Sequence, residues 1–231
     1  MPRRTPQLAL SLPDRPRWGG RRDGAGRKPG LNPGLAHGSR AHFRKALPAH
    51  VTLRMRPDVP SLRTVKIVHE IERTFAAGCT RPGFRLVHYS LQGNHAHLVV
   101  EAQDPIALGR GMMAIGARLA RAVNRVAKRS GPVLADRYHS RMLPTPREVH
   151  RALRYVLLNA RKHAAAVGKA MRLDPASSAR WFDGWRRGAR TVHETAVTVA
   201  YADPPVARAR TWLLTIGWRR YGLLDPAAVP G

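Results

Sequence analysis

The stretch NHAHLVVE, residues 94–101, places two histidines on either side of one small residue, at the start of an apolar run. This pattern predicts a β-strand, in which successive side chains point to opposite faces. His95 and His97 then project from the same face, close enough to bind one metal ion. The apolar residues between and after them point the other way, toward a predicted core. Taken alone, two histidines on one strand face are more often ordinary polar residues than ligands.

The residues before this stretch predict two strands and a helix. Alternating apolar residues predict a strand that begins at Val51. Ser61 is a plausible N-cap for a helix that ends near Gly78. Residues 84–91 predict a second strand, and the turn at residues 92–94 joins it to the histidine strand as an antiparallel hairpin.

The residues after this stretch predict two further helices around a short strand. Asp104 and Pro105 begin a long helix, which Gly131-Pro132 ends. Residues 133–143 predict a strand or hairpin, and a capping box at residues 145–148 opens the next helix. The resulting order, β-α-β-β-α-β-α, predicts an α+β fold: a ferredoxin-like antiparallel sheet with helices on one face.

Composition divides the chain into three parts. Residues 1–48 are rich in Pro, Gly and Arg and predict a mostly disordered basic arm, residues 49–165 form the patterned domain, and residues 166–231 predict a helical C-terminal extension. The extension holds four of the five tryptophans. Its aromatic residues either form the core of a small helical unit or, around residues 218–221, stack on unpaired bases.

The charge of the chain is strongly positive. The 231 residues include 41 Lys and Arg against 14 Asp and Glu, a formal net charge of +27. Such a charge predicts a polyanionic partner, nucleic acid first of all, although an Arg-rich proteome or a ribosome-bound protein would give the same balance. The single cysteine, Cys79, excludes an internal disulfide and a Cys-based zinc cluster. No apolar run approaches the ~20 residues that span a bilayer.

The helix predicted after Pro146 carries two polar residues of interest. Tyr155 and Asn159 are four residues apart and therefore lie together, just off one edge of the apolar stripe. We expect them to look out beside the buried surface. A phenol and a carboxamide one helical turn apart could serve one site together.

The sequence resembles the one-tyrosine HUH transposases, particularly their REP-associated tyrosine transposase branch. It has the site residues of that family in the same order: His95, His97, Tyr155 and Asn159. Residues 131–139 and 155–159 also resemble this branch, and the resemblance covers roughly residues 48–165. It implies a metal-dependent single-strand DNA endonuclease and strand transferase. His95, His97 and Asn159 would bind Mg²⁺ or Mn²⁺, and Tyr155 would attack phosphorus to form a covalent 5′-phosphotyrosine.

The resemblance also implies the partners. The substrate would be a REP-like hairpin in single-stranded DNA, the enzyme a monomer or homodimer, and its location the bacterial cytoplasm rather than a membrane. The Gly26-Arg27-Lys28-Pro29 segment resembles the core of an AT-hook, with a solvated linker as the alternative. The candidate DNA-binding cations are Arg118, Arg121, Arg125, Lys128, Arg129, Arg137, Arg27 and Lys28.

Two alternatives stay open at this point. Tyr138 is a rival nucleophile, and Asp136 either adds a carboxylate near the metal or pairs with Arg137 or Arg141. The rival function is a non-catalytic DNA- or RNA-hairpin-binding regulator that keeps the same fold.

Overall fold

The structure is a computed structural model that describes residues 42–166, 173–186 and 204–228, the side chains of residues 161–166 excepted. All of these residues belong to one unit, residues 35–231. The predicted basic arm lies outside the described residues except for its last seven positions. Among the described helices, none combines the length and the apolar character that crossing a bilayer requires.

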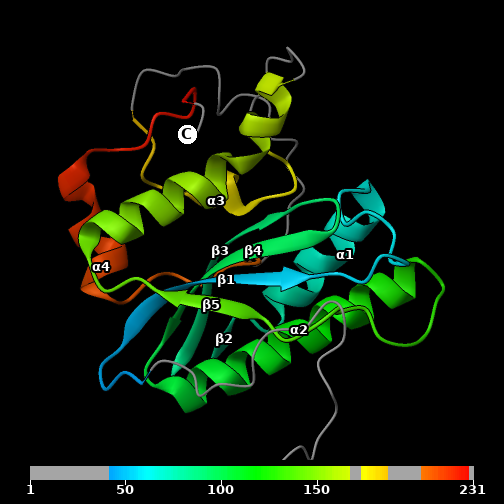
Figure 1. The fold of residues 1–231 in the computed structure, drawn as a ribbon. Coiled ribbons are helices and arrows are strands. Elements are labelled where there is room, and N and C mark those ends of the chain that lie inside the picture. Colours follow the sequence, from blue (N-terminus) through cyan, green and yellow to red (C-terminus); the bar gives the residue numbers. More distant parts are fainter. Residues whose placement is uncertain (1–41, 167–172, 187–203, 229–231) are drawn as a thin grey trace, which may run out of the picture. The chain divides into compact units, whose positions relative to one another are not determined.

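Five antiparallel strands form one sheet in the order β2-β3-β4-β1-β5 (Figure 1). The strands are β1 (Leu47–Arg54), β2 (Thr80–Arg81), β3 (Phe84–Leu91), β4 (His95–Ala102) and β5 (His139–Met142). Without the two-residue β2, the strands lie in the order β3-β4-β1-β5, with β1 between β4 and β5. This is the ferredoxin-like arrangement. The predicted α+β class and antiparallel sheet are therefore confirmed.

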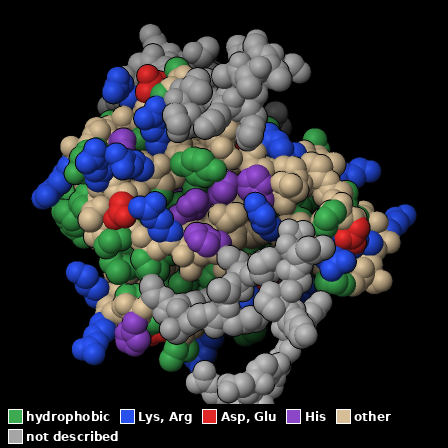
Figure 2. Space-filling model, viewed as in Figure 1, with side chains coloured by type: hydrophobic (Ala, Val, Ile, Leu, Met, Phe, Trp, Pro, Cys, Tyr) green, Lys and Arg blue, Asp and Glu red, His purple; other side chains and the backbone are tan. Residues whose placement is uncertain are grey.

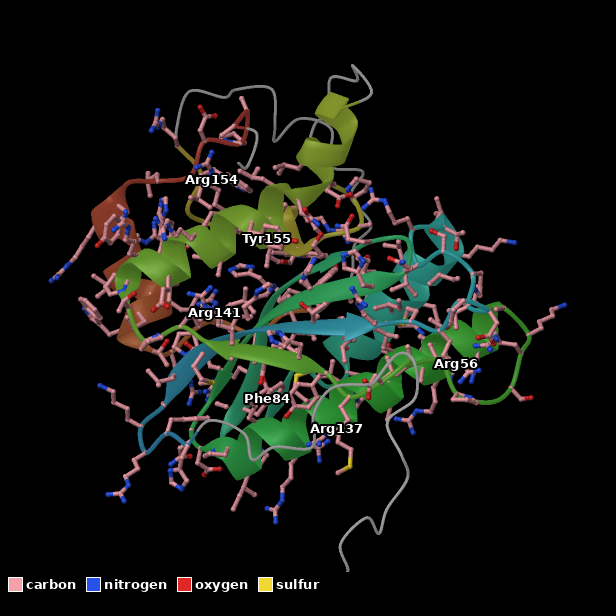
Figure 3. All side chains as sticks on the ribbon, viewed as in Figure 1. Arg56, Phe84, Arg137, Arg141, Arg154 and Tyr155 are labelled. Carbon is pink, nitrogen blue, oxygen red and sulfur yellow. The ribbon has the colours of Figure 1, made fainter. Side chains whose placement is uncertain are left out.

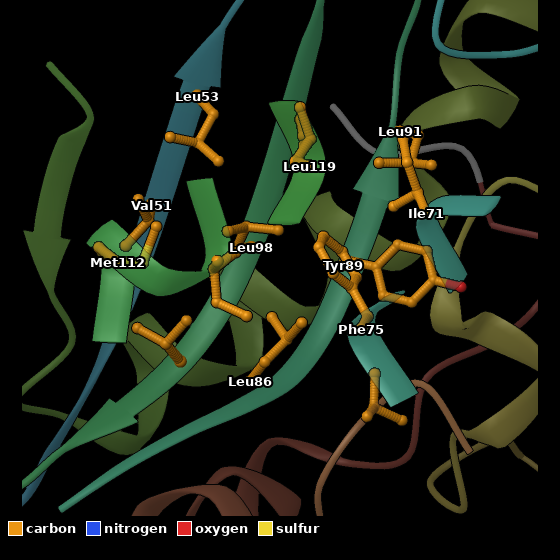
Figure 4. Close-up of a cluster of buried hydrophobic side chains, with 14 of the residues drawn as sticks. Val51, Leu53, Ile71, Phe75, Leu86, Tyr89, Leu91, Leu98, Met112 and Leu119 are labelled. Atoms are coloured by element: carbon orange, nitrogen blue, oxygen red, sulfur yellow. The ribbon is translucent and has the colours of Figure 1, made fainter. Parts of the chain in front are cut away.

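Two helices, α1 (Val65–Ala76) and α2 (Pro105–Val126), pack against each other on one face of the sheet. Their apolar residues meet alternate residues of β1, β3 and β4 in a single buried cluster, part of which is drawn in Figure 4. The strand residues in this cluster include Val51, Leu53 and Leu98, and the helices contribute Ile71 and Met112. Burial of this area supplies the main driving force for the fold.

The opposite face of the sheet is covered by α3 (Pro146–Ala166) and by short pieces of the C-terminal extension. Val87 and Val99 point to this face and would be exposed without a cover. The apolar stripe of α3 buries them in a second cluster, which Phe182 and Trp218 of the extension complete. Helices therefore occupy both faces of the sheet, whereas the sequence predicted them on one, because Val87 and Val99 make part of the second face apolar.

The extension packs on this second cluster through short helical pieces: η1 (Ser178–Trp181), α4 (Trp212–Thr215) and η2 (Gly217–Tyr221). Trp218 is buried, so it belongs to the core and is not free to stack on bases. The buried Glu101 carboxylate of β4 accepts hydrogen bonds from the backbone N–H groups of Arg210 and Thr211 at 2.7–3.0 Å, and from the Thr211 hydroxyl at 2.6 Å. These bonds tie the extension to the histidine strand.

Several predicted boundaries are confirmed and three are wrong. β1 begins at Leu47 rather than Val51, and α2 ends at Val126, before Gly131-Pro132. Asp104 caps α2, since its Oδ1 accepts from the Ala107 N–H at 2.7 Å, and Thr145 and Glu148 pair at the start of α3. The first helix begins at Val65 rather than directly after Ser61. The Ser61 hydroxyl accepts from the Arg63 N–H at 3.3 Å and so stabilises a local turn that delays the helix.

Candidate active site

The two histidines of β4 lie on the face of the sheet that α3 covers. Their Nε2 atoms are 3.1 Å apart, and the His97 side chain is buried. In Figure 2, histidine side chains gather at the centre of the face viewed, with Lys and Arg side chains beside them. Two nitrogens that bind one cation at right angles, each at about 2.1 Å, lie about 3 Å apart. The pair therefore fits a shared cation.

Tyr155 reaches this pair from α3. Its hydroxyl oxygen is 3.3 Å from Nε2 of His97, and the two ring centroids are 5.0 Å apart. Figure 3 shows the tyrosine between α3 and the sheet. The side chain is 36% exposed, so it is open to solvent on one side and in contact with the histidines on the other. A phenol and two imidazoles thus converge on one point.

Strand β1 contributes two residues that the sequence did not single out. His50 Nε2 and Thr52 Oγ1 each lie 3.2 Å from Nδ1 of His97. Thr52 stands directly opposite His97 in the antiparallel register. Partners at Nδ1 orient the ring and leave Nε2 to face Tyr155 and His95. The sequence could have indicated both residues, because they alternate with Val51 and Leu53 and therefore lie on the polar face of β1.

Burial keeps these imidazoles neutral. Desolvation lowers the pKa of His97 to about 3, with a further contribution from the neighbouring His50 and His95. It lowers the pKa of His50 to about 4, helped by the charges of His139 and Arg141. A neutral imidazole has a lone pair to give, which is the form that binds a metal. The environment of His97 therefore matches the chemistry of a ligand.

Asn159 does not occupy the position expected of it. The sequence predicts that Tyr155 and Asn159 look out beside the buried surface, but Asn159 is only 3% exposed. All residues from Val156 to Ala160 are buried. The edge of the apolar stripe of α3, where Asn159 lies, is therefore covered as well as its centre. Among the described residues, no hydrogen bond joins Asn159 to His95 or His97. No group of three or more His, Cys, Asp or Glu side chains in the described part of the chain is arranged to hold a metal.

A cavity of about 290 Å³ opens beside Tyr155, between β5 and α3. It is lined by His50, Arg141, Leu143, Glu148, Arg151, Ala152 and Tyr155. Glu148 holds Arg141 by an ion pair of 3.1 Å. The cavity thus combines two guanidinium groups with an apolar wall, at the open side of the tyrosine.

The rival nucleophile, Tyr138, lies elsewhere. It packs against the cluster under α1 and α2, as does Met142 farther along the same segment. His139 and Arg141 alternate with Tyr138 and Met142 along the chain, so they lie on the opposite face, beside His50. The Oδ1 atom of Asp136 accepts from the backbone N–H of Arg137 at 2.6 Å.

Most of the predicted DNA-binding cations lie on the other side of the sheet. Arg118, Arg121 and Arg125 belong to α2, which covers the face opposite the histidines, and Lys128 and Arg129 directly follow it. Arg125 pairs with Glu70, Arg129 pairs with Asp58 at 2.6 Å, and Arg118 donates to the Thr74 carbonyl at 3.3 Å. Arg137 follows these, in the segment before β5, and Arg27 and Lys28 lie outside the described residues.

No family model and no curated protein matches the chain. Among solved structures, it is similar to a REP-associated tyrosine transposase bound to a REP hairpin, at 12% identity and a TM-score of 0.44, over 56% of this chain and 74% of that one. It is also similar to a protein from Deinococcus radiodurans described as a candidate transposase, at 13% identity and a TM-score of 0.37, over 46% of this chain and 85% of that one. Both are named as transposases. At this level of identity, an activity has to be derived from the chain's own residues.

Proposed function

We propose that the chain is a metal-dependent single-strand DNA endonuclease and strand transferase with Tyr155 as its nucleophile. One observation carries the proposal: the Tyr155 hydroxyl lies 3.3 Å from the Nε2 atom of His97, which is itself 3.1 Å from Nε2 of His95. The net charge of +27 supports a polyanionic substrate.

The reaction is an exchange of phosphodiester bonds. The hydroxyl of Tyr155 gives its proton to water as its oxygen attacks phosphorus, the P–Oη bond forms, and the bond from phosphorus to the 3′ oxygen breaks. The electron pair leaves with the 3′ oxygen, which takes a proton from water and becomes a 3′ hydroxyl. A 3′ hydroxyl can attack the phosphotyrosine in turn and restore the tyrosine, so that joining needs no external energy source.

His95 and His97 are the residues that would hold the cation, through neutral Nε2 atoms, with Asn159 as a further oxygen ligand if its carboxamide turns toward them. A divalent cation offsets the charge of the scissile phosphate, which otherwise repels an anionic nucleophile. Nitrogen and oxygen ligands are compatible with Mn²⁺ and Mg²⁺. Thr52 and His50 would keep the ring of His97 in place.

A non-catalytic regulator that binds hairpins is the second candidate. The observation in its favour is that no group of three or more His, Cys, Asp or Glu side chains in the described part of the chain is arranged to hold a metal. Such a protein would use the basic surface and leave Tyr155 unreacted.

Covalent capture separates the two candidates. The protein is mixed with a pool of labelled single-stranded hairpin oligonucleotides and Mn²⁺, then run on a denaturing gel. A labelled band at the protein's position, lost with EDTA, is the expected result. Reversible binding without such a band, over a range of hairpins and metals, would favour the regulator.

A further inference from the structure

The exposed positions of α3 form a single stripe that ends at the tyrosine. Between Pro146 and Tyr155, the exposed residues are Arg147, Arg151, Arg154 and Tyr155. Their spacing of four, three and one places them on one side of the helix. Three consecutive exposed positions of α3 are therefore arginines, and the fourth is the residue that reaches the histidines.

The cavity beside Tyr155 continues this stripe toward β5. Arg151 lines it from α3, and Arg141 lines it from β5. Figure 3 places Arg141 and Arg154 to either side of Tyr155. Leu143 and Ala152 give the cavity an apolar wall. Its volume of about 290 Å³ is at the lower end for ligand pockets and suits a group of the size of one nucleotide.

Two arginines of this surface are available to a ligand, since Arg147 and Arg151 make no ion pair with any residue that the structure describes. At the cavity, Glu148 offsets the charge of Arg141. On α2, Arg125 lies against Glu70, while Arg110 and Arg121 likewise make no ion pair with a described residue. What distinguishes α3 is therefore position: its exposed arginines lead along the helix to Tyr155 and the cavity, whereas those of α2 lie on the opposite face of the sheet.

We propose that single-stranded DNA reaches Tyr155 along this surface, which we call the α3 ridge: Arg147, Arg151 and Arg154 with the cavity lined by Arg141. The arginines bind successive phosphates, and the cavity receives the nucleotide beside the cleaved bond. Arg147 to Arg154 spans about 10 Å of helix, or about three phosphate intervals of a stacked strand. This inference rests on the proposed function for the role of Tyr155 but not for the binding itself.

Two matched triple variants test the α3 ridge. One is R147Q/R151Q/R154Q on α3, and the other is R110Q/R121Q/R125Q, which removes the same charge from exposed positions of α2. Binding of a fluorescein-labelled 20-nucleotide oligothymidylate is measured by anisotropy over a range of salt concentrations. Because each arginine neutralises a phosphate, the α3 variant should bind about tenfold more weakly or worse, and its salt slope should fall by about two.

The α2 variant should lose less than about threefold in affinity, through long-range electrostatics, and keep its salt slope. Equal losses in the two variants, or a larger loss in the α2 variant, would overturn the α3 ridge. All six arginines are exposed, so both variants should unfold at the wild-type temperature. Should a triple variant be destabilised, the single changes R151Q and R121Q give the same comparison.

The outcomes for the α3 ridge and for the proposed function remain distinct. If the wild type forms no covalent adduct while only the α3 variant loses oligothymidylate affinity, the α3 ridge stands and the nuclease proposal fails. If the wild type forms the adduct and both triple variants bind alike, the nuclease proposal stands and the α3 ridge fails.

Discussion

The two long helices, α2 and α3, are nearly equal in length and both carry exposed arginines, but they differ in where those arginines lead. On α2, Arg125 faces the carboxylate of Glu70, while Arg110 and Arg121 make no ion pair with a described residue, and all three lie on the face of the sheet away from the histidines. On α3, the exposed arginines lead toward Tyr155, whose hydroxyl lies beside His97. A count of cations predicts a polyanionic partner, but the fold decides which of those cations lie on the way to the tyrosine.

The largest effect is expected from the residue at the end of the α3 ridge. Tyr155→Phe removes one oxygen from a partly exposed side chain, so the fold should persist. Covalent attachment of DNA should fall by about 10³-fold or more, because no other tyrosine of the described residues contacts His95 or His97. Oligothymidylate affinity should stay at the wild-type level.

Tyr138→Phe is the matched control on the α2 side of the sheet, and it should retain the adduct. An adduct in Tyr155→Phe that disappears in Tyr138→Phe would reverse the assignment. The two variants are compared on denaturing gels with the same labelled hairpins and Mn²⁺.

The next effect separates the chemistry from the binding. His95→Ala/His97→Ala should lower adduct formation by about 10²-fold or more, since the neutral imidazoles that would hold the cation are gone. Its affinity for oligothymidylate should stay within about twofold of the wild type, because phosphate contacts by arginine dominate. Full adduct formation by this variant would exclude the histidines as metal ligands; a large loss of affinity would mean that they bind the strand directly.

Stability should depend on pH through the face that α3 covers. His88 is buried there, its Nδ1 lies 3.2 Å from the Ser178 hydroxyl, and burial lowers its pKa from 6.5 to about 4 against a small opposing effect of Asp183. Between these pH values, the unfolded chain holds more protons at this residue than the folded protein. The contribution of His88 to the free energy of unfolding should therefore be fully present above pH 6.5. The free energy of unfolding should fall by up to about 3 kcal/mol as the pH drops to 4.

Urea titrations of the wild type and His88→Gln between pH 4 and 7 measure this dependence. The variant cannot titrate at this position, so its free energy of unfolding should fall less steeply than that of the wild type. Identical pH profiles would show that His88 does not contribute.

The smallest effect concerns the support of His97. Thr52→Val removes the hydroxyl that lies 3.2 Å from Nδ1 of His97 while keeping the size of the side chain. The affinity for Mn²⁺, measured by calorimetry, should fall about tenfold. Thr80→Val, on the exposed β2, is the matched control and should bind Mn²⁺ like the wild type. Unchanged affinity in Thr52→Val would leave His50 as the partner that orients the ring.

The sequence was sufficient where the structure depends on near neighbours. The alternation in residues 94–101 predicted the strand and the shared face of His95 and His97, and Asp104 predicted the start of α2 through a local cap. Tyr155 was singled out by its place on the helical wheel and by the resemblance. All of these features depend on residues a few positions apart.

The rest depended on contacts between distant parts of the chain. Thr52 meets His97 through the β1–β4 register across 45 residues, and no local pattern encodes that pairing. The ion pair of Arg129 with Asp58 joins residues 71 positions apart. A helical wheel places Asn159 at the edge of its stripe, but whether an edge is buried depends on what packs there.

The central claim is that Tyr155 is the group that bonds to DNA, and mass spectrometry of the trapped adduct tests it most directly. The protein is incubated with labelled single-stranded hairpins and Mn²⁺, the DNA is digested, and tryptic peptides are searched for a phosphate-linked nucleotide. The account predicts this modification on the peptide that runs from Tyr155 to Arg161. A modification on the Tyr138–Arg141 peptide, or no modified peptide under conditions where the hairpin binds, would contradict it.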